Sequence, residues 1–389
     1  MISQNVIDKA AVSAKELFCH LHRHPELSWG EVETTDRLCA QMNALGIRIL
    51  RRGVGKAGTG LIAQIDGERP GPVVALRADI DALPVRENSG VPYPSERDGV
   101  MHACGHDAHT SILTGAAAVL QSMRHDLTGS VRLIFQPAEE SGYESGAVPM
   151  IQAGALDGVS AIFGLHVWAL LPMGTIGWRS GAIMASADIW EVTVTGKGGH
   201  GSEPQTAIDP TVAAGAMIGA LQSIVSREID PREAAVVSIG RLNGGTAINI
   251  IPQDCFMAGN VRTTTRELRE AMEEKFRRIL NGLAEAYRCK VQLKWTPIYP
   301  VTVNDPDACR FFVSCLTDAG LGDRLSETPI ILGSEDFSYY GQKIPANFCF
   351  LGMGTKHPHH SPEFRVDPEV IPLGIRVMAE LGLGWGRKN

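Results

Sequence analysis

Four residues with metal-binding side chains lie in three short polar segments of the chain. Two lie in the segment 102–109, namely Cys104 and His106. Glu140 ends the segment 136–140, and His166 ends the segment 164–166. Thiolate, imidazole and carboxylate groups are the usual ligands of zinc and related divalent ions. A second carboxylate, Glu139, lies beside Glu140, where a metal-activated water would need a base. The pattern predicts a metal-dependent hydrolase.

Each of these signals has an ordinary structural explanation when it is taken alone. A Cys-x-His pair is usually incidental, because cysteine is among the most buried residue types, but here four Cys and His residues occupy 102–109. Adjacent glutamates are usually a solvated pair, and His166 alone is as easily a core histidine as a ligand. The histidine-rich segment 356–362 offers one more ligand, and composition does not choose among His357, His359 and His360.

The secondary structure expected around these residues places the polar groups at strand ends. Helices are predicted over 5–46, with a turn at 22–28, and over 110–123; strands are predicted over 60–66, 72–79, 131–135 and 161–165. Strands that alternate with helices predict an α/β sheet with parallel members. Asp79 and Asp81 end one strand, Glu139 and Glu140 follow another, and His166 closes a third. Ligands of such sheets gather at the carboxyl ends of strands, so these residues should converge on one site.

The pattern changes between residues 184 and 298. Alternating residues over 189–194, 234–239 and 256–262 predict antiparallel strands, and 290–295 predicts another. A long amphipathic helix should begin near Thr264, with Glu267 completing a capping box. The chain of 389 residues is long enough for two domains. We therefore expect a discontinuous catalytic domain, 1–183 and 299–389, and an α+β domain inserted over 184–298.

Composition excludes several other classes of protein. A formal net charge of −7 argues against a nucleic-acid partner, because binding phosphates needs clustered Lys and Arg. The most apolar stretch, 211–221, is too short to span a bilayer, and 1–18 is not a signal peptide. The eight cysteines show no paired spacing, which favours reduced thiols in the cytoplasm. Residues 53–58 match G-x-G-x-x-G but precede a predicted strand, so a turn is expected there and not a dinucleotide site.

The ordered motifs together resemble the M20 family of metallopeptidases and amidohydrolases. The resemblance is to the branch of hippurate hydrolases, N-acyl-amino-acid amidohydrolases and indole-acetyl-amino-acid hydrolases, and it covers nearly the whole chain. The matching segments are 22–28, 77–84, 104–109, 136–140, 164–166, 198–202, 249–252, 333–337 and 360–362.

The resemblance implies a fold and a set of site residues. The fold is α/β, a zinc-peptidase-like catalytic domain with a mixed, largely parallel sheet plus an inserted α+β lid domain. Cys104 would bridge two divalent ions, and the remaining ligands would be His106, Glu140, His166 and His360. The resemblance thus selects His360 from the three histidines above. Glu139 would be the general base and acid acting on a hydroxide that bridges the two ions.

The chain departs from the peptidase branch at two of these positions. That branch has His-x-Asp where this chain has Asp79-Ile-Asp81, and a bridging Asp where it has Cys104. Asp81 should keep an orienting role in catalysis, whereas the role of Asp79 is open. Manganese is the expected ion, with zinc, cobalt and nickel as alternatives that suit a thiolate. A Cys104 thiol freed of metal is expected to have a low pKa and to be oxidised easily.

The resemblance also assigns residues of the inserted domain. His200 resembles a group that polarises the oxyanion, in some relatives from the partner subunit, although a loop histidine without a role is the alternative. Asn249 and Arg262 resemble groups that hold the substrate carboxylate; Arg262 could equally be an ordinary strand-end charge. A homodimer through the lid domain is expected from exposed strand edges.

The function predicted from these residues is hydrolysis of small N-acyl-amino acids. Such a metallo-amidohydrolase, carboxypeptidase-like, would cleave a C–N bond and would not be an endopeptidase. The alternatives are a dipeptide or N-carbamoyl-amino-acid hydrolase on the same site, and a metal-containing binding protein whose hydrolytic residues are idle. The position of Glu139 beside Glu140 argues against an idle site. A purely structural zinc protein is the least favoured alternative, because a closed structural metal site has no use for an adjacent base.

Overall fold

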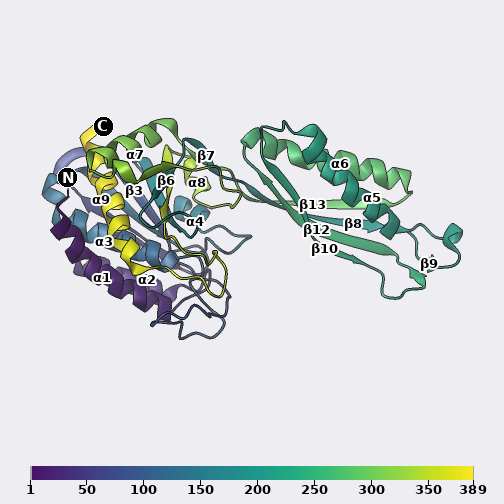
Figure 1. Ribbon diagram of the computed structural model, residues 1–389, viewed down its shortest axis with the longest axis horizontal. Helices are drawn as coiled ribbons and strands as arrows, with labels where there is room; N and C mark the ends of the chain where they lie inside the picture. Colours follow the sequence, from purple (N-terminus) through teal and green to yellow (C-terminus); the bar gives the residue numbers. More distant parts are fainter. Residues whose placement is uncertain (1, 389) are drawn as a thin grey trace. The chain divides into compact units, whose positions relative to one another are not determined.

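The computed structural model describes residues 2–388 and divides into two compact units. Within the described residues, unit 1 comprises 2–183, 302–329 and 336–388, and unit 2 comprises 184–301 and 330–335. The expected insertion, 184–298, begins where unit 2 begins, but the chain returns to unit 2 at 330–335. Six isolated residues have no hydrophobic periodicity of their own, so this return could not be recognised from the sequence. Figure 1 shows the elements of each unit.

Unit 1 is built on a mixed eight-stranded sheet with the order β1-β2-β4-β3-β5-β16-β6-β15. Its central pairings, β3 with β4, β3 with β5 and β5 with β16, are parallel, as is the pairing of β15 with β6. The strands are β1 (Arg48–Val54), β2 (Thr59–Asp66), β3 (Arg69–Asp79), β4 (Thr128–Gln136), β5 (Val159–Trp168), β6 (Ile176–Trp178), β15 (Leu325–Glu327) and β16 (Ala346–Gly352). The predicted α/β class with a largely parallel sheet is confirmed.

Strand β1 was not predicted, because it carries three arginines and lies at the edge of the sheet, where its side chains are mostly exposed. It pairs antiparallel with β2. Residues 55–58 form the turn that joins them. The G-x-G-x-x-G sequence is therefore part of a hairpin, as expected, and opens no helix.

The helices of unit 1 bury long apolar faces against the sheet and one another. They are α1 (Gln4–Arg23), α2 (Val32–Ala44), α3 (His106–Ser122), α4 (Ala147–Gln152), α7 (Pro306–Asp318), α8 (Ser338–Gly341) and α9 (Ile371–Lys388). Helices α3 and α9 pack on β3, and α1 packs on both helices. The α3–α9 crossing is close because Gly115 and Gly374 face isoleucines; a Cβ at Gly374 would lie 2.5 Å from Ile112. A two-stranded sheet of β7 (Gly181–Met184) and β14 (Thr302–Asn304) completes the unit.

Helix α3 begins at His106, four residues before the predicted start. Its first turn carries His106, Asp107 and His109, which have low helix propensity in isolation. All three side chains are buried and are hydrogen-bonded to carboxylates or a histidine outside the helix. These tertiary contacts, which the local sequence does not reveal, extend the helix into the polar segment.

Unit 2 is a four-stranded antiparallel sheet of order β10-β12-β8-β13 with two helices, an α+β arrangement. Its elements are β8 (Ala187–Thr195), β9 (Gly199–His200), α5 (Pro210–Ser223), β10 (Ala235–Gly244), β11 (Ile250–Ile251), β12 (Asp254–Thr263), α6 (Arg266–Ala286) and β13 (Lys290–Tyr299). The stripe of α6 packs around the buried Trp190. The N-cap of α6 is Thr265, whose hydroxyl accepts from the Leu268 N–H, so the predicted Thr264 cap is wrong by one residue. No helix within 2–388 is long and apolar enough to cross a membrane.

Candidate active site

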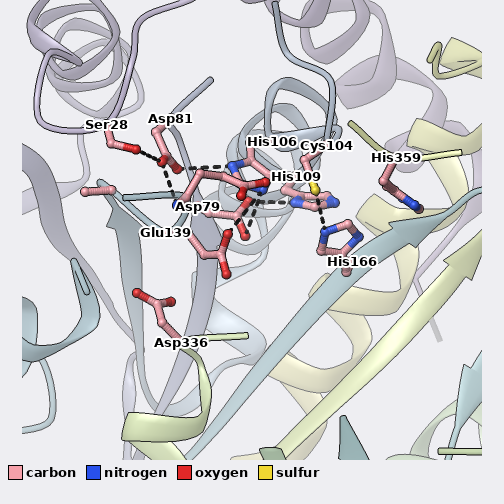
Figure 2. A network of polar contacts seen from close by, with 12 residues as sticks. Ser28, Asp79, Asp81, Cys104, His106, His109, Glu139, His166, Asp336 and His359 are labelled. Atoms are coloured by element: carbon pink, nitrogen blue, oxygen red, sulfur yellow. Dashed lines mark hydrogen bonds and ion pairs between the residues drawn. The ribbon is translucent and has the colours of Figure 1, made fainter. Parts of the chain in front are cut away.

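The candidate site lies at the carboxyl ends of the central parallel strands of unit 1. Asp79 at the end of β3 is in register with Gln136 at the end of β4, and His166 lies two residues beyond the last residue of β5 that pairs with β3. The Cys104–Gly105 turn leads into α3 beside them, and Gly105 is required there (φ +88°), since a Cβ would lie 2.4 Å from Val167. Figure 2 shows the side chains from these segments pointing toward one another.

The predicted metal ligands form two overlapping groups of three that share Cys104. One group is Cys104, His106 and His166, and the other is Cys104, Glu140 and His360. Within each group the possible ligand atoms lie within 4.8 Å of one another. The Cys104 Sγ lies 3.3 Å from His166 Nε2, and His360 Nε2 lies 2.9 Å from a Glu140 carboxylate oxygen. Two such groups with a common sulfur atom have the composition expected of a site for two ions.

The hydrogen bonding of His106 fits a metal ligand. Its Nδ1 lies 3.1 Å from the Asp81 carboxylate, whereas its fully buried Nε2 has no hydrogen-bond partner among residues 2–388. A metal-bound histidine normally makes this pair of contacts, one nitrogen to a carboxylate and the other to the ion. An unpaired buried nitrogen is costly without a ligand, so the residues present suit a cation here.

The electrostatics of the group also favour a cation. Burial, followed by the carboxylates of Glu140 and Glu139, raises the pKa of the Cys104 thiol well above its usual value. The expected low pKa of a metal-free Cys104 is therefore wrong, because three negative groups would share a buried site. Burial lowers the pKa of His106, but the carboxylates of Asp79 and Asp81 outweigh it and raise the value to about 10. Without a metal ion, both ligands hold protons at neutral pH.

Asp81 connects three parts of the site. One carboxylate oxygen faces His106 Nδ1, and the other accepts from the Ser28 hydroxyl (2.6 Å) and from the Glu140 backbone N–H (2.9 Å). The residue is fully buried, and these contacts, with the effect of His106, outweigh burial and keep its pKa below the usual value. An ionised Asp81 thus fixes the ring of His106 and the backbone of Glu140.

Glu139 and Glu140 both reach the site because the chain turns sharply before them. Ala138 has φ +52°, a left-handed conformation that is uncommon for a residue other than glycine. Its N–H donates to the buried Glu31 carboxylate (2.8 Å), which holds the turn in place. One Glu139 carboxylate oxygen lies 4.0 Å from His106 Nε2. Glu139 is therefore adjacent to the predicted ligands while belonging to neither of the two groups that share Cys104.

A second polar layer lies beneath the ligands. The fully buried Arg77 donates to Asp79 (2.7 Å), to Asp336 (2.7 Å) and to the Gln136 side chain (3.0 Å). Asp336 also accepts from the Ser145 hydroxyl (2.7 Å). These contacts give the motif residues Arg77, Gln136 and Asp336 a structural explanation that the sequence did not reveal, because the partners are up to 259 positions apart in the chain.

Asp79 and His109 were not assigned a role from the sequence. Their contacts differ in what they leave available to an ion, because a carboxylate that accepts two hydrogen bonds keeps further lone pairs, whereas a histidine has only two ring nitrogens. Asp79 accepts from Arg77 and from His109 Nδ1 (2.6 Å), and His109 Nε2 accepts from the Val167 N–H (2.8 Å). Both nitrogens of His109 are thus occupied, although it lies within 4.8 Å of His106 and Asp79. We therefore place His109 outside the ligand set.

The predicted substrate residues belong to unit 2, and the structure separates them within that unit. His200 and Asn249 lie together, since β9 pairs with β11 and the Gly201 N–H donates to the Asn249 carbonyl. His200 lines a cavity of about 610 Å³ between the turns at 198–200 and 245–254. Arg262 donates to Ser334 (2.7 Å). It lies on β12, eight residues from Asp254, the end of the strand that is nearest to His200 and Asn249. At about 3.3 Å per strand residue, that spacing is about 26 Å.

Comparison with known proteins identifies relatives along almost the whole chain. The model of the peptidase family M20/M25/M40 matches residues 75–383. An N-acetylcysteine deacetylase of Bacillus subtilis is 44% identical over 365 residues, 93% of this chain and 94% of the relative. An IAA-amino acid hydrolase ILR1-like 2 of Arabidopsis thaliana is 39% identical, covering 94% and 83%. The Bacillus subtilis YXEP protein, a dinuclear metal binding peptidase, has a similar structure with TM-score 0.88, 38% identity and coverage of 98% and 99%.

Proposed function

The chain belongs to the peptidase family M20/M25/M40, and on that premise we propose that it hydrolyses the amide bond of N-acyl-amino acids. It is a hydrolase of this family, and two divalent metal ions are supported by the candidate ligand groups and by the dinuclear relative. The observation that carries the proposal is the pair of ligand groups sharing Cys104 with Glu139 beside them. The names of the deacetylase and the IAA-amino acid hydrolase support an acyl-amino acid as substrate.

The side chains of unit 1 suit the proton transfers of this reaction. Ions held by Cys104, His106, Glu140, His166 and His360, which we propose to be manganese, would activate water and polarise the amide carbonyl. Glu139 takes the proton from the attacking water and returns it to the departing amine. Asp81 keeps His106 oriented throughout.

His200 is suited to donate a hydrogen bond to the developing oxyanion. Its Nδ1 accepts from the Ser202 N–H (3.2 Å) and lies 2.7 Å from the Ser202 hydroxyl. A nitrogen that accepts from a backbone N–H carries no proton, so in the neutral ring the proton resides on Nε2. We propose that Nε2 donates to the oxyanion, and that the substrate carboxylate is bound by Arg262 of one copy of the chain and by Asn249, which lies beside His200, of a second copy.

The spacing within unit 2 favours a homodimer. A small acyl-amino acid cannot contact His200 and Arg262 of one chain when about 26 Å of β12 lies between them. We therefore propose that His200 serves the metal centre of a second copy. The edge strand β10, the turn after it and the short strand β11 expose Leu242, Ile248 and Ile250, respectively, which provide apolar surface for pairing.

Mixed dimers test this assignment. Neither Glu139→Gln nor His200→Ala should be active alone. If His200 acts across the dimer, unfolding and refolding an equal mixture should restore about a quarter of wild-type activity, because half of the dimers are mixed and each has one competent site. If His200 acts within its own chain, the mixture stays inactive.

The Glu139→Gln variant also tests the proposed reaction. Turnover of hippurate and acetyl-amino acids should be lost, while metal content per chain should be unchanged, because Glu139 is not needed to complete either ligand group. Glu68→Gln, at an exposed site, is the matched control. Retained turnover in Glu139→Gln would overturn the assignment of the base.

A peptide substrate is the second candidate, because the dinuclear relative is described as a peptidase. The same ligands and base would serve a dipeptide or an N-carbamoyl-amino acid. Turnover of acetyl-amino acids, hippurate, dipeptides and N-carbamoyl-amino acids should be measured side by side. A preference for dipeptides in kcat/KM would replace the acyl-amino acid proposal.

A further inference from the structure

The peptide group of Val167, directly after the predicted ligand His166, is hydrogen-bonded on both sides by histidines. The Val167 N–H donates to His109 Nε2 (2.8 Å). The Val167 carbonyl accepts from His359 Nε2 (3.0 Å) and from Nδ1 of His166 itself (2.6 Å). We call His109 and His359 the flanking histidines. Neither belongs to the two ligand groups that share Cys104.

These histidines occupy the place of a missing strand. Along β5, the Ile162 N–H donates to Pro345 and the Trp168 carbonyl accepts from Met353, so even-numbered residues face β16. Val167 therefore faces β3, but the β3–β5 pairing ends at Gly164. A buried backbone group without a partner is unfavourable. His109 supplies the acceptor, and His359 the donor, that β3 no longer provides.

The hydrogen bonds determine which nitrogen of each ring carries the proton. His109 accepts at Nε2, so its proton is on Nδ1, which donates to Asp79 (2.6 Å). His166 donates from Nδ1 to the Val167 carbonyl, which leaves its Nε2 lone pair directed at the Cys104 side of the site, 3.3 Å from Sγ. Figure 2 shows His109, His166 and His359 around Cys104.

We propose that His109 and His359 are positioning residues that act on the metal centre through the Val167 peptide group. By fixing that peptide, they fix the carbonyl that selects the His166 tautomer, and hence the direction of its Nε2 lone pair. The proposal rests on the metal centre of the proposed function, and it assigns no contact between the flanking histidines and substrate.

Packing allows the hydrogen bond of His359 to be removed while the ring shape is kept. The His359 ring lies 4.7 Å from Trp168 and 5.0 Å from Phe364, measured between centroids. Phenylalanine would preserve these ring contacts and remove the N–H. Glutamine would lose the ring contacts but place an amide N–H near the Nε2 position. At position 109, glutamine likewise keeps an acceptor for the Val167 N–H, and phenylalanine does not.

The test uses the full-length protein stripped of metal and titrated with Co²⁺, with the visible spectrum and chelator competition as readouts. His359→Phe and His109→Phe should weaken one of the two Co²⁺ equivalents about 10- to 100-fold and change its spectrum, as for other residues that orient ligands. His359→Gln and His109→Gln should bind within a few-fold of wild type. His125→Phe, at an exposed site, is the control.

Two results would overturn the proposal: phenylalanine variants that bind both equivalents as wild type does, or glutamine variants that lose as much affinity as the phenylalanine variants. Circular dichroism of the stripped variants checks that the fold is retained. A wild-type protein that binds two Co²⁺ ions but cleaves no acyl-amino acid would refute the proposed function and leave this inference standing.

Discussion

Replacing Asp81 by Asn should weaken metal binding without altering the shape of the site. In the wild type, one Asp81 oxygen faces His106 Nδ1 and the other accepts from Ser28 and from the Glu140 N–H. The asparagine side chain has one oxygen and one NH₂ group, so it cannot accept on both sides. In either orientation of the amide, its NH₂ group faces another donor, either His106 Nδ1–H or the Glu140 N–H. The clash at His106 is avoided only if the His106 proton moves from Nδ1 to Nε2.

The two orientations have different consequences. If the NH₂ group faces Glu140, a buried backbone donor loses its partner, which costs about 1–3 kcal/mol. If it faces His106, Nδ1 must become an acceptor, and the proton moves to Nε2, where it blocks the ion. Either cost corresponds to a loss of about 10- to 100-fold in affinity, the range found for residues that orient metal ligands.

Chelator competition with Mn²⁺ and Co²⁺ measures this loss. Asp81→Asn should bind about 10- to 100-fold more weakly than wild type, with activity recovering at high metal concentration. Asp318→Asn, at an exposed position, is the matched control and should match wild type. An Asp81→Asn protein with wild-type affinity for both ions would refute the argument that Asp81 selects the His106 tautomer.

Three further predictions follow from the charges in unit 1. His106 (pKa about 10) and Cys104 hold protons in the metal-free protein, so binding of metal at pH 7 should release about two protons, which calorimetry in buffers of different ionisation enthalpy measures. For the same reason, the affinity for metal should rise as the pH increases toward 10. An affinity for metal that is unchanged from pH 6 to 9 would contradict this. Because the pKa of Cys104 is raised, iodoacetamide should alkylate its thiol slowly at pH 7 and faster at pH 10 in protein stripped of metal. Mass spectrometry measures the rate, and rapid alkylation of Cys104 at pH 7 would contradict the prediction. Burial lowers the pKa of His22, but Asp107 and Glu87 outweigh this and raise it to about 9. The protonated His22 therefore stabilises the fold fully below pH 6.5, and this stabilisation is lost as the pH rises through 9. In urea unfolding, the loss of unfolding free energy in His22→Gln relative to wild type should shrink between pH 6.5 and 9; a loss that stays constant would refute the prediction.

How far the sequence predicts this site depends on whether a residue's partners are local. Cys104, His106, Glu140 and His166 could be chosen because they lie in short polar segments that end a predicted strand or precede a predicted helix, and strand ends meet at one edge of a parallel sheet. His360 could not be distinguished from His359 by such reasoning. The structure separates them by backbone conformation: His360 has φ +65° and its N–H is held by Ala103, whereas the His359 side chain turns to Val167.

Residues that support the ligands were missed for the same reason. Nothing in the spacing of Arg77, Gln136 and Asp336 indicates that the Arg77 guanidinium donates to both of the other side chains. From the sequence, His109 cannot be distinguished from the metal-binding histidine of the same segment. The edge strand β1 was missed because three arginines hide its period-two pattern. Local pattern predicted the carboxyl ends of β2, β3 and β4 to within one residue, whereas long-range polar pairing required coordinates.

The charge balance of unit 1 explains why these supports matter. Asp79, Asp81, Glu139, Glu140 and Asp336 are among the carboxylates that lie in or directly beneath the site, and the Arg77 guanidinium contacts two of them, Asp79 and Asp336. Buried charge of one sign is unfavourable unless it is paired. A proton on His106 offsets part of it in the metal-free chain, and a proton on Cys104 avoids one more negative charge; divalent ions would replace those protons with larger charge. Metal binding and folding of the site should therefore be coupled, so that each ion present at 1,000 times its Kd would add about 4 kcal/mol to the free energy of unfolding.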